Sequence, residues 1–322
     1  MSRPEIRAFH GRGQALVMFA LALTALIGLT GLVIDGSSTY VQRRAMQNAA
    51  DLAAMAAGYA YVNGTSMTTA ADNVAAANGY TNGAGQTSVA VSTNALNGNT
   101  AEQITVKVTA PHQNWFSGIF GMASWNVGAT ATVLAGIPNQ IAGGALPLIF
   151  NQDLFTTSGI NPYQTLTYNE PPSGSQSVPY DTQLANYFEF NWTVFCQANG
   201  NTCNANSNVV KGLLNGSLPV TQTTINFGTN IDPLNAGSHT SLFSPLAALV
   251  PGCYPVAIIS GTNTANLQGF GTFCLTSSVG GSTKQIAGYF LNEVLGQGQG
   301  LTIAPGAGTP KFFGAYAVYL AN

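Results

Sequence analysis

Apolar residues gather first in one uninterrupted run from Ala15 to Ile34, which holds 20 residues without a charge. A helix rises about 1.5 Å per residue, so this run would be about 30 Å long, the thickness of a bilayer's hydrocarbon core. No later stretch of the chain is apolar over a comparable length. The pattern predicts a transmembrane helix over residues 14–35, with everything after it on one side of the membrane.

The charges that flank this run predict its orientation. Residues 1–13 carry three Arg and one Glu, whereas Asp35 follows the run and Arg43 and Arg44 come about two helical turns later. The positive-inside rule therefore makes residues 1–13 a cytoplasmic tail and places the domains after residue 35 outside the cytoplasm. A cleavable signal peptide is the alternative, but its apolar region would run only about 7–15 residues. We expect an uncleaved, single-pass anchor in a bacterial cell membrane.

Small residues recur inside the predicted span, with Ala20, Thr24 and Gly28 four apart and Gly31 one further turn on. Such a stripe allows two helices to approach closely in lipid, so these four residues are candidates for helix packing. Ala and Gly are also simply common in membrane helices, and the two interpretations stay open.

The pattern after Asp35 changes to that of an Ala-rich helix. From Ser38 to Tyr61 there is no proline, and Ala is the best helix former. A narrow apolar stripe recurs at spacings of three and four, at Met46, Ala49, Ala53, Ala56 and Ala60. A second helix is expected from about Met67 to Asn78, ended by Gly79.

An ordered set of polar residues surrounds this apolar run. It begins with Gly11–Gln14 and continues with Asp35, Tyr40, Arg43, Arg44, Gln47, Asn48 and Asp51. The set resembles the N-terminal module of TadE/TadG-like Flp pilus-assembly proteins. The resemblance covers about the first 80 residues and extends loosely to about residue 135. The residues from Asp35 to Asp51 named here are its family signature.

The resemblance implies a membrane-anchored component of Tad/Flp pilus assembly, with a structural, scaffolding or anchoring role outside the cytoplasm. It implies other pilus-assembly or pilin-like membrane proteins as partners, and neither enzymatic activity nor a cofactor. Prepilin-like members are cut after a Gly, with Glu at the fifth position beyond the cut. If Gly13 were that glycine, the fifth residue would be Met18. The chain therefore looks more like the larger TadG-type partner than a processed pseudopilin.

From Thr87 the period of the pattern becomes two, as in half-buried strands. Apolar residues alternate from Val89 to Val91 and from Ile104 to Val108, and Trp125–Ala135 is a third expected strand. The aromatic stretch His112–Met122 between them is expected to be a short helix or a loop. Residues 36–136 are thus predicted to form a helical stalk and a small α+β unit.

Residues 137–144 are rich in Gly and Pro and predict a domain boundary. Beyond them, Gly- and Pro-rich loops separate short strands, which are expected at Leu146–Phe150, Phe188–Phe195, Val256–Ser260, Phe270–Thr276, Ile286–Leu291 and Phe313–Leu320. Short helices are expected at Asn208–Ser217 and Ser241–Val250. Residues 145–322 therefore read as a mainly β domain, sandwich-like or an irregular barrel, and the fold class is α+β.

Charged residues make up only 6% of the chain, with nine basic and eleven acidic side chains. A nucleic-acid partner is not expected from so little positive charge. Scarce Lys with abundant Thr, Asn and Gly is typical of exported bacterial surface proteins.

The four cysteines, Cys196, Cys203, Cys253 and Cys274, all lie in the C-terminal half. An even number in an exported region favours disulfides, and four cysteines allow three pairings. Pairing neighbours along the chain closes the shortest loops. Metal binding is the alternative, but no ligand spacing supports it.

Catalytic chemistry has weaker support in the sequence. Ser238 or Ser241 with His239 and Asp232 would supply the residue types of a triad, but no Gly-x-Ser-x-Gly turn surrounds either serine. Paired carboxylates for glycoside chemistry would have to come from Asp153, Glu170, Asp181, Glu189, Asp232 and Glu293. A membrane-anchored surface hydrolase or carbohydrate-binding module is therefore the alternative function.

No residue is predicted to be catalytic, cofactor-binding or metal-ligating, and no small-molecule substrate is expected. Asp35, Ser37 and Thr39 have the spacing of a von Willebrand A metal motif, but they follow an apolar run rather than a buried strand. We expect Asp35 or Ser37 to cap or solvate the membrane exit instead. Gly296–Gly300 lacks the Lys and the strand–helix context of a phosphate loop and is expected to be a flexible turn.

Overall fold

The structure is a computed structural model. It describes residues 11–141, 144–156, 163–172, 188–197, 206–216, 225–228, 230–234, 237, 239–260, 265–295 and 300–321. Contacts divide the chain into two compact units, which are described separately. Unit 1 comprises Met1–Ala53, Ala71–Val91 and Val106–Ala131, and unit 2 comprises Ala54–Ala70, Ser92–Thr105 and Thr132–Asn322.

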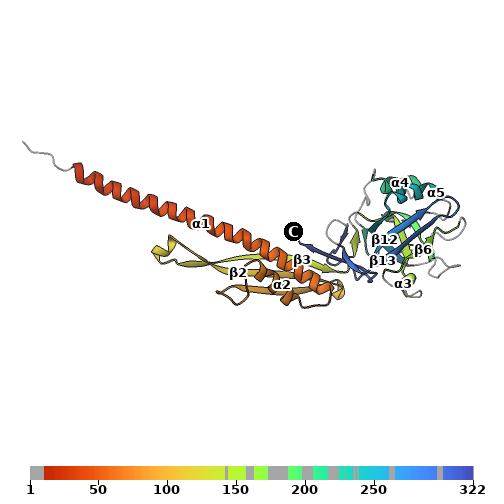
Figure 1. The fold of residues 1–322 in the computed structure, drawn as a ribbon, viewed down its shortest axis with the longest axis horizontal. Helices are drawn as coiled ribbons and strands as arrows, with labels where there is room; N and C mark the ends of the chain where they lie inside the picture. The colour runs from red at the N-terminus through yellow and green to blue at the C-terminus, as the bar shows by residue number, and fades with distance from the viewer. Residues whose placement is uncertain are drawn as a thin grey trace, which may run out of the picture. The chain divides into compact units, whose positions relative to one another are not determined.

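Helices and three long strands occupy the chain up to residue 136 (Figure 1). They are α1 (Gly11–Val62), α2 (Met67–Ala77), β1 (Ser88–Leu96), η1 (Asn97–Asn99), β2 (Ala101–Gln113), η2 (Ser117–Phe120) and β3 (Ser124–Gly136), where η marks a 3₁₀ helix.

Mostly short strands follow. They are β4 (Gln140–Ile141), β5 (Leu148–Asn151), β6 (Leu166–Asn169), β7 (Phe188–Glu189), β8 (Asn191–Gln197), β9 (Ile225–Asn226), β10 (Asn230–Pro233), β11 (Gly252–Ser260), β12 (Ala265–Val279), β13 (Gln285–Leu291), β14 (Glu293–Leu295), β15 (Leu301–Thr302) and β16 (Ala315–Leu320). Three helices lie among them: α3 (Asp153–Thr156), α4 (Ser207–Leu214) and α5 (Thr240–Ala247).

Helix α1 is unbroken from the predicted membrane segment through the Ala-rich segment, which confirms the expected continuation (Figure 1). Of the predicted stripe, Met46, Ala49 and Ala53 are fully buried and Ala60 is nearly so, whereas Ala56 is only half-buried. The buried face also contains Ala50, Ala54 and Ala57. A face of small Ala side chains lets the helix approach a sheet closely.

Gly58 shows how close this approach is within unit 2. A Cβ built on Gly58 would lie 2.7 Å from Val318 Cγ1 on β16 and 3.3 Å from both methyl carbons of Val133 on β3. Glycine inside a helix costs about 1 kcal/mol relative to Ala. The close packing against two Val side chains explains why glycine stands here.

The last strand of the chain joins the sheet of the first strands. The five-stranded sheet has the order β1-β2-β3-β16-β14. Strand β16 runs antiparallel to β3, with Val318 opposite Ala135, and β14 runs parallel to β16. The sheet therefore combines segments from both sides of residues 137–144.

The larger sheet of unit 2 has the order β10-β8-β5-β11-β12-β13-β6-β7. Strand β10 also pairs with the start of β12, where Ile231 lies opposite Ala265. Because β10 pairs with both β8 and β12, five strands of this sheet close into a ring. The expectation of a mainly β domain is confirmed. Burial alternates along β13, as in a strand with one face on the core.

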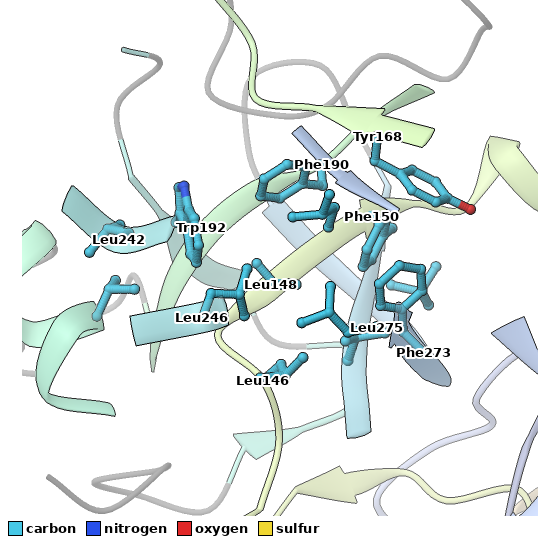
Figure 2. Packing of buried hydrophobic residues seen from close by; sticks show 14 of the residues in the cluster. Leu146, Leu148, Phe150, Tyr168, Phe190, Trp192, Leu242, Leu246, Phe273 and Leu275 are labelled. Carbon is cyan, nitrogen blue, oxygen red and sulfur yellow. The ribbon is translucent and has the colours of Figure 1, made fainter. Parts of the chain in front are cut away.

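Aromatic side chains fill the main core of unit 2 (Figure 2). Phe150 on β5 is fully buried and has its ring centroid 5.0 Å from that of Phe273 and 5.2 Å from those of Tyr168 and Phe290. Trp192 packs edge-on against Phe243 of α5 at 5.5 Å. Burial raises the pKa of the Tyr168 hydroxyl.

A disulfide joins Cys253 on β11 to Cys274, which lies directly opposite on β12. It staples the two central strands of the large sheet at one end. Cys203 and the side chain of Cys196 lie outside the described part of the chain, and their pairing stays a prediction.

Replacing Phe150 by Ala should weaken unit 2, because a fully buried aromatic side chain would leave a cavity. We expect a loss of about 3–5 kcal/mol, which makes the amides of β11 and β12 exchange at least about a hundredfold faster by global opening. Hydrogen exchange with mass spectrometry of the full chain measures this. Val279→Ala, at a side chain 43% exposed, is the control and should change exchange little. Unchanged exchange in Phe150→Ala would contradict the assigned core.

Candidate membrane-proximal site

The side chains on the apolar half of α1 are exposed. The large apolar residues from Leu16 to Ile34 are between 42% and 73% exposed. Among the residues that the structure describes, α1 is the helix long and apolar enough, by length and composition, to cross a membrane. A continuous apolar surface of this kind suits hydrocarbon better than water.

Asp35 lies inside α1 at the end of this apolar half, and its carboxylate is fully buried. It does not cap α1, which continues for seven further turns. Instead it accepts hydrogen bonds from the loop between β2 and β3. The backbone N–H groups of Trp115 and Ser117 donate to it at 2.9 and 2.7 Å, and that of Phe116 at 3.1 Å.

The Ser117 hydroxyl adds a fourth donor group, at 2.8 Å from Asp35 Oδ2. These donors belong to the N-terminus of the 3₁₀ helix η2 and the residues just before it. Backbone N–H groups at a helix start have no partner within the helix, and they carry partial positive charge. Asp35 therefore caps a helix that lies 80 residues later in the sequence.

The same face of α1 continues with polar contacts one and two turns after Asp35. Ser38 Oγ lies 3.0 Å from His112 Nε2, and Thr39 Oγ1 accepts from Trp125 Nε1 at 3.1 Å. Gln42 contacts His112 Nδ1 through its side-chain oxygen and donates to the Pro111 carbonyl at 3.3 Å. The buried His112 ring in turn stacks on Trp125.

These contacts fasten the two arms of the β2–β3 hairpin to α1 (Figure 1). The hydroxyl of Tyr80 also donates to α1, at the Gln42 carbonyl, and burial raises the pKa of this tyrosine. The spacing of Asp35, Ser38, Thr39 and Gln42 places them on one helical face.

One turn before Asp35 the contact becomes apolar. A Cβ built on Gly31 would lie 2.6 Å from Phe116 Cβ, so glycine is required for the loop to approach. A groove of about 340 Å³ continues from there between α1 and the hairpin tip. Its walls are Thr24, Ile27, Gly28 and Leu32 of α1, and Phe116, Ser117, Ile119, Phe120 and Met122 of the tip.

The groove and the Phe116 contact involve three of the four small residues of the predicted packing stripe. Gly31 contacts the hairpin of its own chain, and Thr24 and Gly28 line the groove. The Thr24 hydroxyl also donates to the Ala20 carbonyl within the helix. Close packing of Ala20, Thr24 and Gly28 against a helix of another protein stays a prediction.

The family signature residues divide between two faces of α1. Asp35 and the side chain of Gln47 face the hairpin, and Gln47 donates both to Asp51 and to the Thr130 carbonyl of β3. Tyr40, Arg43, Arg44 and Asn48 lie exposed on the outward face. There the Arg44 guanidinium lies 6.0 Å from the centre of the Tyr40 ring.

The residues with metal-motif spacing, Asp35, Ser37 and Thr39, make hydrogen bonds within the chain instead. Ser37 donates to the Ile34 carbonyl, and Thr39 donates to the Asp35 carbonyl, so both hydroxyls turn back to the helix backbone. The carboxylate itself is occupied by the loop's N–H groups. Within the described ranges no cluster of three His, Cys, Asp or Glu could hold a metal ion.

Two of the residues considered for hydrolysis, His239 and Glu170, are brought together in unit 2. His239 contacts Glu170 through its ring and its backbone N–H, and Glu170 is buried. A groove of about 210 Å³ in this unit is lined by Phe155, Phe290, Leu291, Asn292, Phe312, Phe313 and Gly314, and none of the considered acids lines it. Asp181, Ser238 and residues 296–299 lie outside the described residues, as do the side chains of Asp232 and Glu293.

Sequence reasoning missed the partners of Asp35. The stretch His112–Met122 was expected only as a short helix or loop, and it forms η2 at the tip of the hairpin. One signal could have linked the two: a lone acid ends the apolar run, and an uncharged aromatic loop connects two strands. Nothing in the local pattern fixes that the two meet.

A family model described as Putative Flp pilus-assembly TadE/G-like matches residues 13–79. The match contains α1 from Gly13 onward and all of α2. It confirms the resemblance for this N-terminal module. Neither a curated protein nor a solved structure matches the chain.

Replacing Asp35 by Ala should release the hairpin tip, because the backbone N–H groups of residues 115–117 would lose their acceptor. We expect these amides to exchange about tenfold faster or more in the full chain in detergent, measured by hydrogen exchange. Asp72→Ala removes an acid whose hydrogen bond to Asn82 is exposed, and it should leave the tip unchanged. Full protection of the tip in Asp35→Ala would contradict the capping role.

Proposed function

We propose that this protein is a single-pass, membrane-anchored component of Tad/Flp pilus assembly that acts by structural scaffolding or anchoring outside the cytoplasm. The observation that carries the proposal is the coincidence of two findings at one place. The TadE/G-like match begins at residue 13, and the exposed apolar half of α1 begins in the same turn. A module of a pilus-assembly family is thus built around a helix suited to a membrane.

The proposed layout assigns each part of the chain to a compartment. Residues 1–13 form the cytoplasmic tail and residues 14–35 cross the cell membrane. Residues 36–136 form the stalk with its small α+β unit, and residues 145–322 form the mainly β extracytoplasmic domain. The Cys253–Cys274 disulfide supports this placement of the last domain, because disulfides persist in oxidising compartments.

We propose that the outward face of α1 meets other pilus-assembly or pilin-like membrane proteins. Tyr40, Arg43, Arg44 and Asn48 belong to the family signature and are exposed. Within the described part of the chain, no ion pair holds Arg43 or Arg44. Signature residues that do not stabilise their own chain are available for recognition. The proposal includes no catalytic step.

The orientation is tested with reporters fused after Asn322. Alkaline phosphatase should be active and a cytoplasm-dependent fluorescent protein should be dark, because the domains after residue 35 are placed outside. Mass spectrometry of the membrane-extracted chain should recover residues 14–35. Active fluorescence would reverse the orientation, and a chain starting beyond residue 35 would replace the anchor with a cleaved signal peptide.

The role in assembly is tested in the native host. Deletion of the protein should abolish surface pili seen by electron microscopy of sheared fractions. Complementation by the Arg43→Glu/Arg44→Glu double variant should fail, since charge reversal on an exposed face repels a partner without unfolding the chain.

The matched control is Lys107→Glu, which reverses an exposed charge on β2 and should restore pili fully. Normal pili in the deletion strain would reject the proposed function. Normal pili with the double Arg variant alone would reject only the assignment of the outward face.

A further inference from the structure

The tip of the β2–β3 hairpin, residues 115–122, presents large apolar side chains on its outside. Trp115 is 79% exposed, Ile119 77%, Phe120 73% and Met122 56%. No charged residue lies between Lys107 and the end of β3. Four large apolar side chains on one exposed turn call for a covering surface.

The position of this tip along α1 identifies the surface. The tip lines a groove with Thr24, Ile27, Gly28 and Leu32. Thr24 precedes Asp35 by eleven residues, which is about 16 Å along a helix, whereas one leaflet supplies about 15 Å of hydrocarbon. A tip that packs on this part of the helix lies at the depth of a leaflet.

We infer that the hairpin tip is buried in the bilayer beside α1. It is a second membrane contact, which the sequence pattern does not predict. Lipid acyl chains pack on Ile119, Phe120 and Met122 and fill the groove of about 340 Å³. The occupant of the groove is thus hydrocarbon of the leaflet that surrounds residues 24–34. This inference rests on the proposed membrane crossing of residues 14–35.

Hydrocarbon requires that backbone polar groups be paired within the protein, and six backbone N–H groups of the tip are paired in this way. The N–H groups of Trp115, Phe116 and Ser117 donate to Asp35. Those of Ile119, Gly121 and Met122 donate at 3.1 Å to carbonyls within the tip, those of Phe116, Gly118 and Ser117 respectively. The buried carboxylate of Asp35 is itself surrounded by donors.

Contacts between hairpin and helix change in polarity at the level expected for a membrane surface. Before Asp35 they are apolar, at Gly31 and around the groove. From Asp35 to Gln42 they are hydrogen bonds, including that of Thr39 with Trp125. An aqueous loop would have no reason to follow the apolar run of the helix. Continuity with the crossing helix favours lipid as the occupant.

The test uses the full chain reconstituted in vesicles of phosphatidylethanolamine and phosphatidylglycerol. These contain a phosphatidylcholine with a photoactivatable diazirine on its acyl chain. After irradiation and proteolysis, mass spectrometry locates the lipid adducts. We expect adducts on residues 115–122 as well as on the apolar half of α1. Val279 and Phe312, which are 43% and 40% exposed in unit 2, should carry none.

A variant sharpens the result. Ile119→Ser/Phe120→Ser should reduce adducts on the tip about tenfold, since each polar side chain disfavours hydrocarbon, and should leave adducts on α1 unchanged. Hydrogen exchange at Ser117 checks that the tip still binds Asp35. The matched control is Val279→Ser/Phe312→Ser, which should leave the adducts on the tip at the level of the unaltered chain.

The outcomes separate this inference from the proposed function. Adducts on α1 without adducts on the tip overturn the inference and leave the anchor intact. Adducts on neither segment overturn the membrane crossing and with it the inference. A photo-crosslinking Phe analogue at Ile119 tests native membranes: conjugation to lipid supports the inference. A discrete crosslinked protein band would assign the groove to a protein helix and overturn it.

Discussion

The structure around α1 depends on one buried carboxylate. Asp35 stands where an apolar helix face gives way to a polar one, and a charge there must be matched by donors or by water. The loop before η2 supplies the donors, from three backbone N–H groups and one hydroxyl. The helix gains a satisfied charge, and the loop gains an acceptor for N–H groups that its own short helix leaves unpaired.

That single contact fixes the register of hairpin against helix. With Asp35 on η2, Gly31 must lie under Phe116, and the hydroxyls of Ser38 and Thr39 meet His112 and Trp125. The inward face of α1 is therefore covered by contacts with its own chain over several turns. Its outward face keeps Tyr40, Arg43 and Arg44 exposed. The family signature is thus divided between residues that fasten the hairpin and residues that stay exposed.

Unit 2 is built by other means, since the chain carries few charges. Its main core is an aromatic cluster around Phe150, and its central strands β11 and β12 share a disulfide. Closure of five strands through β10 pairs strand edges that would otherwise be exposed to other chains. Within the described part of the chain, this unit is therefore held by apolar packing and strand pairing rather than by ion-pair networks.

Much of this fold could be predicted from period and composition. The lengths of the apolar run and the Ala-rich stretch predicted α1, and alternation predicted β1 and β2, because both signals depend on near neighbours in the sequence. Pairings such as β16 with β3, and β10 with β12, carry no such signal. These pairings join segments far apart in the chain. Many strands have a similar pattern, so the pattern does not show which two strands pair.

A helix suited to a membrane, its family module and a mainly β region could all be predicted from local sequence patterns. The hydrogen bonds of Asp35 and the position of residues 115–122 depend instead on the folded chain. Burial of a carboxylate is a property of its surroundings, and those surroundings come from a loop 80 residues away. The same fold that satisfies Asp35 carries the apolar tip alongside the predicted span.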